Sequence, residues 1–196
     1  MPRVTEKYRA ARRDEIALAA IRCLERKGVR ETSIADIVAE SGLSTGAIYS
    51  HFTNKAELAR YIVGRYLIIR LDELESDGLA GIVVPPRETL RAMLGVFTET
   101  GLSPALVVQF WGEAMVDGEL KAEMTRTAAK LGHALSNAVL PWARATTASE
   151  AEAVELTAQT ARTLIALAQG YMANAAVFGR RDPAEYIESA ASVLSY

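Results

Sequence analysis

The feature that most constrains the fold is a close series of helix start and stop signals in the first third of the chain. Two pairs of residues fit capping boxes, in which side chain and backbone satisfy each other at a helix start; the pairs are Ser33 with Asp36, and Asn54 with Glu57. Gly28 and Gly42 suit the left-handed conformation that ends a helix. Between these signals there is room only for two helices of seven residues, 34–40 and 45–51. Helices this short are not stable alone, so longer neighbouring helices must hold them.

Helix signals continue through the rest of the chain. Ser149 with Glu152 fits another capping box, and two prolines follow candidate cap residues, at Ser103-Pro104 and Asp182-Pro183. Alternating β-type patterns are nearly absent, and residues 81–84 are the one short candidate strand. The sequence therefore predicts an all-α fold of about nine helices. Their expected ranges are 5–27, 34–40, 45–51, 55–75, 86–99, 104–116, 119–144 (bent or ended near Pro141), 150–178 and 183–195, with a loop at 76–85.

Length and composition restrict the class of protein. The 196 residues are half apolar, enough for one ordinary domain or for a small domain fused to a larger one. No apolar run approaches the ~18 residues that a membrane span needs. The basic N-terminus is not followed by an apolar segment, which argues against a secretory signal. Cys23 is the only cysteine, which fits a reducing compartment. We expect a cytoplasmic protein with no membrane partner.

Charge is distributed unevenly along the chain. Residues 1–70 hold 13 Lys and Arg against 8 Asp and Glu, a balance of +5, while residues 71–196 hold 9 against 16, a balance of −7. A basic first third favours contact with a polyanion such as nucleic acid. A scatter of solvated charges is the alternative reading of the same numbers.

The stretch SGLSTGAIYSHFTN at 41–54 has the composition of neither a core helix nor an ordinary surface helix. Its apolar positions can join a small core with the neighbouring helices: Ile34, Ile37, Val38, Leu43, Ile48 and Phe52 against Ile16, Ala20, Leu24 and Leu58. The outward positions are then Ser44, Thr45, Gly46, Ala47, Tyr49, Ser50 and His51. A helix that enters the DNA major groove, roughly 12 Å wide, must approach closely, and small residues allow this. A tight helical hairpin with a polar surface is the structural alternative.

A family resemblance rests on the segment TSIADIVAESGLSTGAIYSHFTNKAELA, residues 32–59. It resembles the DNA-binding signature of the tetracycline-repressor (TetR) family, and with the first helix the likeness extends over residues 8–63. The resemblance implies a helix-turn-helix domain at 1–54 and a ligand-binding and dimerisation domain at 55–196, with the helix at 55–75 as connector. It also implies a homodimer that represses transcription from double-stranded operator DNA until a small molecule releases it.

Site residues are carried over from this resemblance by position. Those expected at phosphates are Thr32, Ser33, Tyr49, His51 and Lys55; those expected at bases are Thr45, Gly46, Ala47 and Ser50, with Ser44 beside them. The helix at 45–51 has no Arg, Lys, Asn or Gln for bidentate reading of a base. Specificity is then expected from thymine methyl contacts, from hydroxyls, from water, or from an N-terminal arm that carries Arg3.

The helix at 150–178 is nearly uncharged over ARTLIALAQGYMANAAVFG, which indicates burial on more than one side. Two copies of this helix and of the helix at 183–195 can form an intermolecular four-helix bundle; an ordinary core within one chain is the alternative. The expected dimer residues are Leu164, Ala168, Tyr171, Met172, Ala175, Phe178, Tyr186, Ile187, Ala190, Val193 and Leu194.

A small-molecule cavity is expected among the helices between residues 86 and 178, because ligand cavities are apolar with a few polar anchors. Candidate lining residues are Met93, Phe97, Gln109, Phe110, Trp111, Glu113, His133, Asn137, Tyr171 and Asn174. His133 and Asn137 are four residues apart on one helix face and suit a shared anchor; exposure to solvent is the other reading.

Three functions compete at this point. A ligand-responsive transcriptional regulator accounts for the basic first third and for the 32–59 motif. An enzyme is disfavoured, because the sequence has only two histidines, no metal-ligand cluster and no glycine-rich phosphate loop, and we expect no metal and no cofactor. The third candidate is a helical interaction protein with a repurposed DNA domain.

Overall fold

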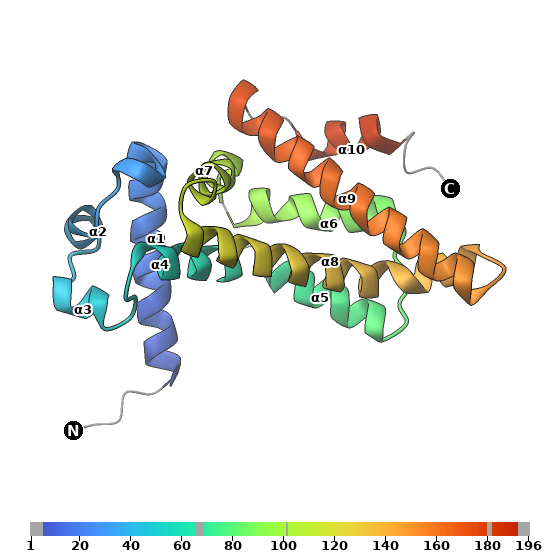
Figure 1. Cartoon of the computed structure of the whole chain (residues 1–196), viewed down its shortest axis with the longest axis horizontal. Helices are drawn as coiled ribbons and strands as arrows, with labels where there is room; N and C mark the ends of the chain where they lie inside the picture. Colours follow the sequence, from blue (N-terminus) through green and yellow to red (C-terminus); the bar gives the residue numbers. More distant parts are fainter. Residues whose placement is uncertain (1–5, 66–68, 101, 180–181, 192–196) are drawn as a thin grey trace. The chain divides into compact units, whose positions relative to one another are not determined.

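The computed structural model describes residues 6–65, 69–100, 102–179 and 182–191, and all regular structure within these ranges is helical. The ten helices of the described residues are α1 (Glu6–Glu31), α2 (Ile34–Ser41), α3 (Thr45–Tyr49), α4 (Lys55–Val63), α5 (Ile69–Leu79), α6 (Pro86–Glu99), α7 (Pro104–Ala114), α8 (Gly118–Thr146), α9 (Glu150–Phe178) and α10 (Pro183–Ala191) (Figure 1). The all-α prediction is confirmed, and the candidate strand at 81–84 is not a strand.

The chain forms two compact units. The first consists of residues 1–63 and 109–124, and the second of residues 64–108 and 125–196. The chain therefore passes from the first unit to the second, returns to the first and ends in the second, with α7 and α8 each contributing to both. The expected functional boundary between residues 54 and 55 stays a prediction.

The core of the first unit is in part the one that the sequence pattern predicts. Its largest fully buried side chains are Ile16, Ile37, Ile48, Phe52, Leu58, Ile62 and Phe110. The predicted core residues Ile34, Val38 and Leu43 are only partly buried. Helices α2 and α3 lie beside α1, which is more than twice as long as either (Figure 1). The two short helices are thus stabilised by tertiary packing, as helices of this length must be.

The end of α1 extends beyond the predicted stop at residue 27. Gly28 has φ 84°, so the helix is interrupted there, but helical backbone resumes to Glu31. Gly42 with φ 69° ends α2 in the left-handed conformation, as predicted. Helix α9 ends at its C-cap residue Gly179, which has φ 92°.

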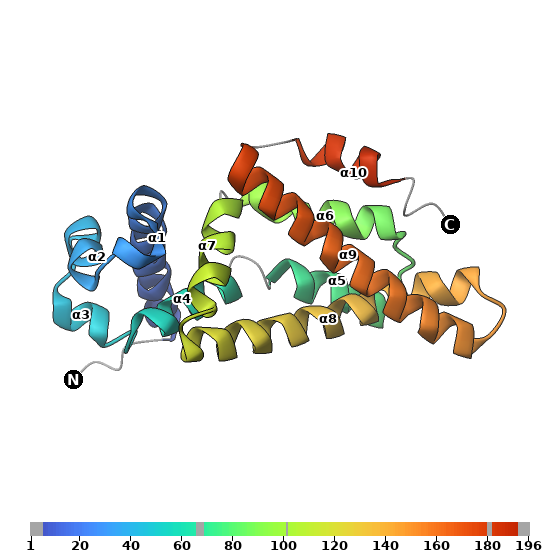
Figure 2. The ribbon, with the colours of Figure 1, turned by 45° about the horizontal axis from the view of Figure 1, so that its top comes forward.

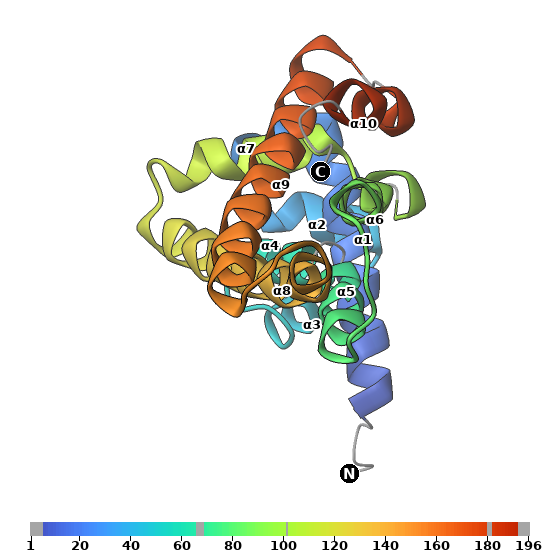
Figure 3. The ribbon, with the colours of Figure 1, turned by 90° about the vertical axis from the view of Figure 1, so that its right-hand side faces the viewer.

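In the second unit, α6 packs against α9, α10 and α5 (Figures 2 and 3). Its buried face includes Leu90, Met93, Leu94 and Phe97. An aromatic group forms part of the same core: the Tyr171 ring lies 6.1 Å from the Phe97 ring and 5.4 Å from the Tyr186 ring.

One predicted boundary is wrong: α5 continues to Leu79, inside the expected loop at 76–85. Of the expected helix at 55–75, the structure describes α4 to Val63 and α5 from Ile69, and residues 66–68 lie outside the described residues. Helix α8 continues through Pro141 to Thr146, two residues beyond the expected end at residue 144. A proline inside a helix removes one backbone hydrogen bond, and the burial of Leu135, Val139 and Trp142 on either side keeps the helix intact.

No single described helix is long and apolar enough to cross a membrane. The bent pair α6 and α7 reaches the required length and apolarity only when the two helices are taken together.

Candidate nucleic-acid interface and ligand cavities

Helix α2 begins with a complete capping box. The Ser33 Oγ accepts a hydrogen bond from the Asp36 N–H at 3.2 Å, and the Asp36 Oδ2 accepts one from the Ser33 N–H at 2.8 Å. Lys27 Nζ lies 2.5 Å from the Asp36 Oδ1. The hydrogen bond from Lys27, followed by those from Ser33, holds the pKa of the Asp36 carboxyl far below its usual range. The start of α2 is thereby fixed to α1.

Helix α3 presents small side chains to solvent. Ser44 is its N-cap and accepts from the Ala47 N–H at 3.2 Å. Thr45 and Gly46 are exposed, Tyr49 is half exposed, and Ile48 is fully buried against the core. No atom lies within 4 Å of the place where a Cβ on Gly46 would be. The outward face therefore has the shape expected of an element that approaches another surface closely.

Arginines of α1 surround the chain just after α3. Arg13 stacks on the Phe52 ring at 4.5 Å and also bonds to Glu57 at 3.3 Å. Burial, then the nearby Arg13 and further α1 arginines, lowers the pKa of His51 below its usual value. The His51 Nδ1 is buried and has no hydrogen-bond partner among the described residues. This side of α3 is therefore basic and holds an unpaired polar atom.

Two residues expected at phosphates make internal contacts instead. The Thr32 side chain is buried, and its Oγ1 donates to the Gly28 carbonyl at 2.7 Å. Lys55 Nζ donates to the carbonyl of Val29 and, at 3.4 Å, to that of Arg30. Burial lowers the pKa of Lys55. These residues join the end of α1 to α2 and α4, while Ser33, Ser44, Thr45, Gly46, Tyr49 and Ser50 are exposed. Arg3 lies outside the described residues.

The candidate ligand residues fall into separate groups. Phe110 and Glu113 line a cavity of about 170 Å³ in the first unit, together with Val29, Arg30, Lys55, Ala56, Ala59, Asp117 and Leu120. In the same unit, the Gln109 Oε1 accepts from the Val29 N–H at 2.9 Å. Trp111 also belongs to this unit. Met93, Phe97 and Tyr171 belong to the core of the second unit, and Asn174 donates to the Gly170 carbonyl at 3.0 Å.

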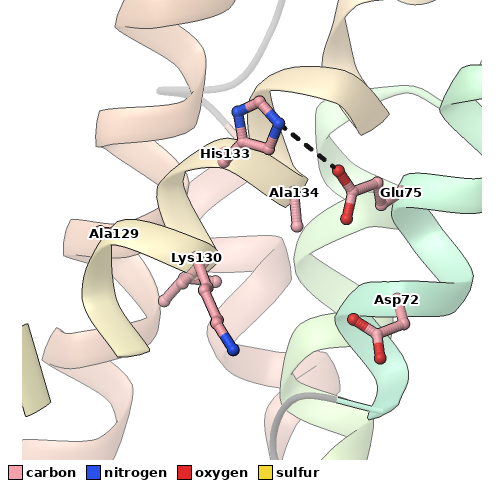
Figure 4. Close-up of a pocket in the computed structure, with 7 residues that line it drawn as sticks. Asp72, Glu75, Ala129, Lys130, His133 and Ala134 are labelled. Carbon is pink, nitrogen blue, oxygen red and sulfur yellow. Dashed lines mark ion pairs between the residues drawn. The ribbon is translucent and has the colours of Figure 1, made fainter. Parts of the chain in front are cut away.

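His133 and Asn137 meet at a residue that the sequence analysis missed. Both face Glu75 on α5: Asn137 Nδ2 donates to the Glu75 Oε1 at 2.6 Å, and His133 Nε2 lies 3.9 Å from it. Glu75 and His133 line a cavity of about 530 Å³ in the second unit (Figure 4). The sequence gives no signal for Glu75, because nothing in the local pattern around residue 75 pairs it with a helix some sixty positions later.

Most of the candidate dimer residues are turned into their own unit. Those buried within the second unit are Leu164, Ala168, Tyr171, Met172, Ala175, Ile187 and Ala190. The Tyr186 hydroxyl donates to the Leu167 carbonyl at 2.7 Å within the same unit. Phe178 alone of the described candidates is mostly exposed, at 76%. Within one chain, α6 and α10 pack against the apolar face of α9, and the dimer residues stay a prediction. Val193 and Leu194 lie outside the described residues.

The geometry of α1 to α3 defines the class: a three-helix helix-turn-helix unit with α3 as the exposed second helix of the α2–α3 pair. Residues 16–62 match the sequence profile of the family described as bacterial regulatory proteins, tetR family. Residues 16–62 therefore carry the helix-turn-helix region of the tetR family.

Curated relatives match mainly over this N-terminal region. The chain is 41% identical over 63 residues to the transcriptional regulator TtgR of Pseudomonas putida, covering 32% of this chain and 30% of that protein. It is 32% identical over 114 residues to the regulator BetI of Yersinia pestis, covering 56% of this chain and 57% of that protein. The matches thus span less than two thirds of the length of these relatives.

Solved structures share the fold over nearly the whole chain. A TetR transcription regulator from Haloarcula marismortui superposes with a TM-score of 0.70 at 18% identity, covering 95% of both chains. A transcriptional regulator from Saccharomonospora viridis, in complex with choline, superposes with a TM-score of 0.67 at 17% identity, covering 95% of this chain and 97% of that one. At these identities the likeness shows the fold.

Proposed function

We propose that the protein is a homodimeric repressor that binds operator DNA through α3 and releases it when a small molecule binds the second unit. The observation that carries the proposal is the outward face of α3, where Thr45 and Gly46 are exposed while Ile48 anchors the helix in the core. A helix whose inner face packs in the core and whose outer face carries small side chains can lie deep in a major groove.

The interface we propose has two kinds of contact. Thr45, Gly46, Ala47 and Ser50 face base edges, where hydroxyls and methyl-sized groups can read them. Ser33, Ser44, Tyr49 and His51 face phosphates, supported by the basic surface of α1. We assign Thr32 and Lys55 a positioning role, since their hydrogen bonds join α1 to α2 and α4.

Dimerisation is proposed through the outward side of α9. Exposed residues recur along its C-terminal half at helical spacing: Ala166, Gln169, Ala173 and Val177, followed by Phe178. Val177 is 69% exposed. Apart from Gln169 the stripe is apolar, and the small Ala166 and Ala173 allow close approach of a second α9 related by a twofold axis. Two helix-turn-helix units are needed because one alone makes few contacts with DNA.

Release by a small molecule is supported by the 530 Å³ cavity in the second unit. The volume falls within the range of about 300 to 1,000 Å³ that ligand sites occupy. The choline complex of the S. viridis regulator is a solved example of a ligand held by this fold. A ligand acts on DNA affinity only if it binds the DNA-competent and DNA-released states unequally.

The test is an electrophoretic mobility shift with DNA from the protein's own promoter region. Gly46→Leu should abolish the specific shift, because a bulky side chain would hold α3 away from the groove, while the circular dichroism spectrum stays unchanged. Gly118→Leu is the matched control, since Gly118 is also exposed, with no atom within 4 Å of its Cβ position. Wild-type affinity in Gly46→Leu would remove α3 from the interface. No DNA binding by the wild type would favour a helical interaction protein instead.

A further inference from the structure

The cavity of about 530 Å³ in the second unit lies between α5 and α8 (Figure 4). Helix α5 contributes two carboxylates, Asp72 and Glu75. Helix α8 contributes the remaining lining residues, which are Ala129, Lys130, Leu131, His133 and Ala134. Most of the lining surface is apolar, both carboxylates lie on α5, and Lys130 and His133 lie on α8.

The two helices are locked together next to this cavity. An ideal Cβ at Gly78 would clash with the Asn137 carbonyl oxygen, so α5 and α8 are in backbone contact there. One turn earlier on α5, the Asn137 amide holds the Glu75 carboxylate at 2.6 Å. The position of Glu75 in the cavity wall is therefore fixed by a contact that glycine alone permits.

The charges that line the cavity differ in how far they are withdrawn from water. The Glu75 side chain is only 26% exposed, whereas that of His133 is 77% exposed. Lys130 is also exposed and can point its ammonium to solvent. The described residues give Glu75 one ionisable neighbour within 4 Å, the solvated His133. A partly desolvated carboxylate held by a neutral amide attracts a cation more strongly than a carboxylate in open water does.

We propose that this cavity binds a small organic cation with an apolar body. Its positive group lies against Glu75 and Asp72, and its apolar part lies along Leu131 and Ala134. The inference rests on the proposed function only in making this cation the molecule that releases DNA; the binding itself is a property of the second unit.

Calorimetric titration of the intact protein without DNA tests the charge requirement directly. The probe is phenyltrimethylammonium, compared with its neutral carbon isostere tert-butylbenzene and with the anion benzenesulfonate. The cation should bind at least tenfold more tightly than the isostere, and the anion should not bind. Equal binding of cation and isostere, preference for the anion, or no binding of the cation would each overturn the proposal.

Variants locate the cation in the cavity. Glu75→Gln keeps an acceptor for Asn137 but removes the charge, and should weaken phenyltrimethylammonium binding at least tenfold. Asp77→Asn is the matched control, because it removes one exposed carboxylate from the same helix outside the cavity lining and should leave the affinity within twofold. Lys130→Met removes the competing cation and should tighten binding. Unchanged affinity in both Glu75→Gln and Lys130→Met would place the cation elsewhere and sink the assignment.

The mobility shift separates this inference from the proposed function. If the protein binds promoter DNA but no cation, the DNA-binding role stands and the cavity assignment fails. If it binds the cation but no DNA, the cavity assignment stands and the regulator role fails. If both bind, phenyltrimethylammonium near its own dissociation constant should lower DNA affinity, and an unchanged shift would rule out the cation as the releasing molecule.

Discussion

At the scale of single residues, His51 makes the stability of the first unit depend on pH. Its ring is half buried beside arginines of α1, and burial followed by their charge lowers its pKa. The folded state therefore binds the proton more weakly than the unfolded chain does. Stability should be greatest above the ordinary histidine pKa of about 6.5 and should fall as the pH drops through that value toward the folded pKa.

We predict that His51→Gln flattens the stability profile between about pH 5 and pH 7. Urea denaturation at several pH values, at fixed protein concentration, measures this. His133→Gln is the control, because the His133 side chain is 77% exposed and no unpaired buried nitrogen is involved. A slope that is the same in wild type and His51→Gln would show that other groups account for it.

At the scale of elements, helix α2 depends on its N-cap residue, Ser33. Ser33 satisfies the Asp36 N–H, and Asp36 in turn satisfies the Ser33 N–H and pairs with Lys27 of α1. An eight-residue helix cannot replace this loss by additional turns. The cap at Ser33 therefore stabilises α2, the helix against which α3 packs.

Ser33→Ala should destabilise the protein by about 1 kcal/mol, the usual cost of losing an N-cap. Chemical denaturation gives the free energy of unfolding. Ser189→Ala, in the interior of α10, removes a hydroxyl that bonds only to the Glu185 carbonyl and should cost much less. Equal effects of the two changes would mean that the capping box contributes nothing special.

The contact between α5 and α8 is a second feature at this scale. Gly78 lies against the backbone of Asn137 and Ala138, whereas Gly132, also helical, has no atom within 4 Å of its Cβ position. The same chemical change should thus have opposite signs at the two positions.

Gly78→Ala should destabilise by about 1 to 3 kcal/mol, because backbone cannot move aside as a side chain can. Gly132→Ala should stabilise by about 0.5 to 1 kcal/mol through helix propensity. Thermal and urea denaturation of both variants decide the matter. Stabilisation by Gly78→Ala would show that α5 and α8 are not in backbone contact.

At the scale of the whole molecule, the proposed dimer depends on which side of α9 faces outward. Ala168 and Ala175 are buried within the second unit, while Ala173 is exposed. A charged residue on the buried side should destabilise the fold of one chain, whereas a charged residue on the exposed side should destabilise only the dimer.

Ala173→Arg should therefore convert the dimer to folded monomers. Specific DNA binding should weaken at least tenfold, because the two helix-turn-helix units lose their fixed spacing. Sedimentation and circular dichroism on the same sample test this. Ala168→Arg should instead lower the helical content and the melting temperature. A wild type that sediments as a monomer at micromolar concentration yet binds its operator specifically would contradict the dimer proposal.

The sequence alone determined those features that depend on near neighbours. The capping box at Ser33, the left-handed Gly42 and the helix periodicity involve residues within a few positions of each other, so the pattern predicts them directly. The burial of Ile37, Ile48 and Phe52 followed from the same periodicity. The motif at residues 32–59 was enough to indicate the family before any coordinates.

The tertiary structure decided what depends on distant partners. Lys55 lies at the carbonyls of Val29 and Arg30, and Glu75 meets Asn137, because chain folding brings segments far apart in sequence together. The apolar face of α9 could serve a core or an interface equally well by composition. Only the packing of α6 and α10 against it assigns that face to the core and leaves Ala173 and Val177 on the outside.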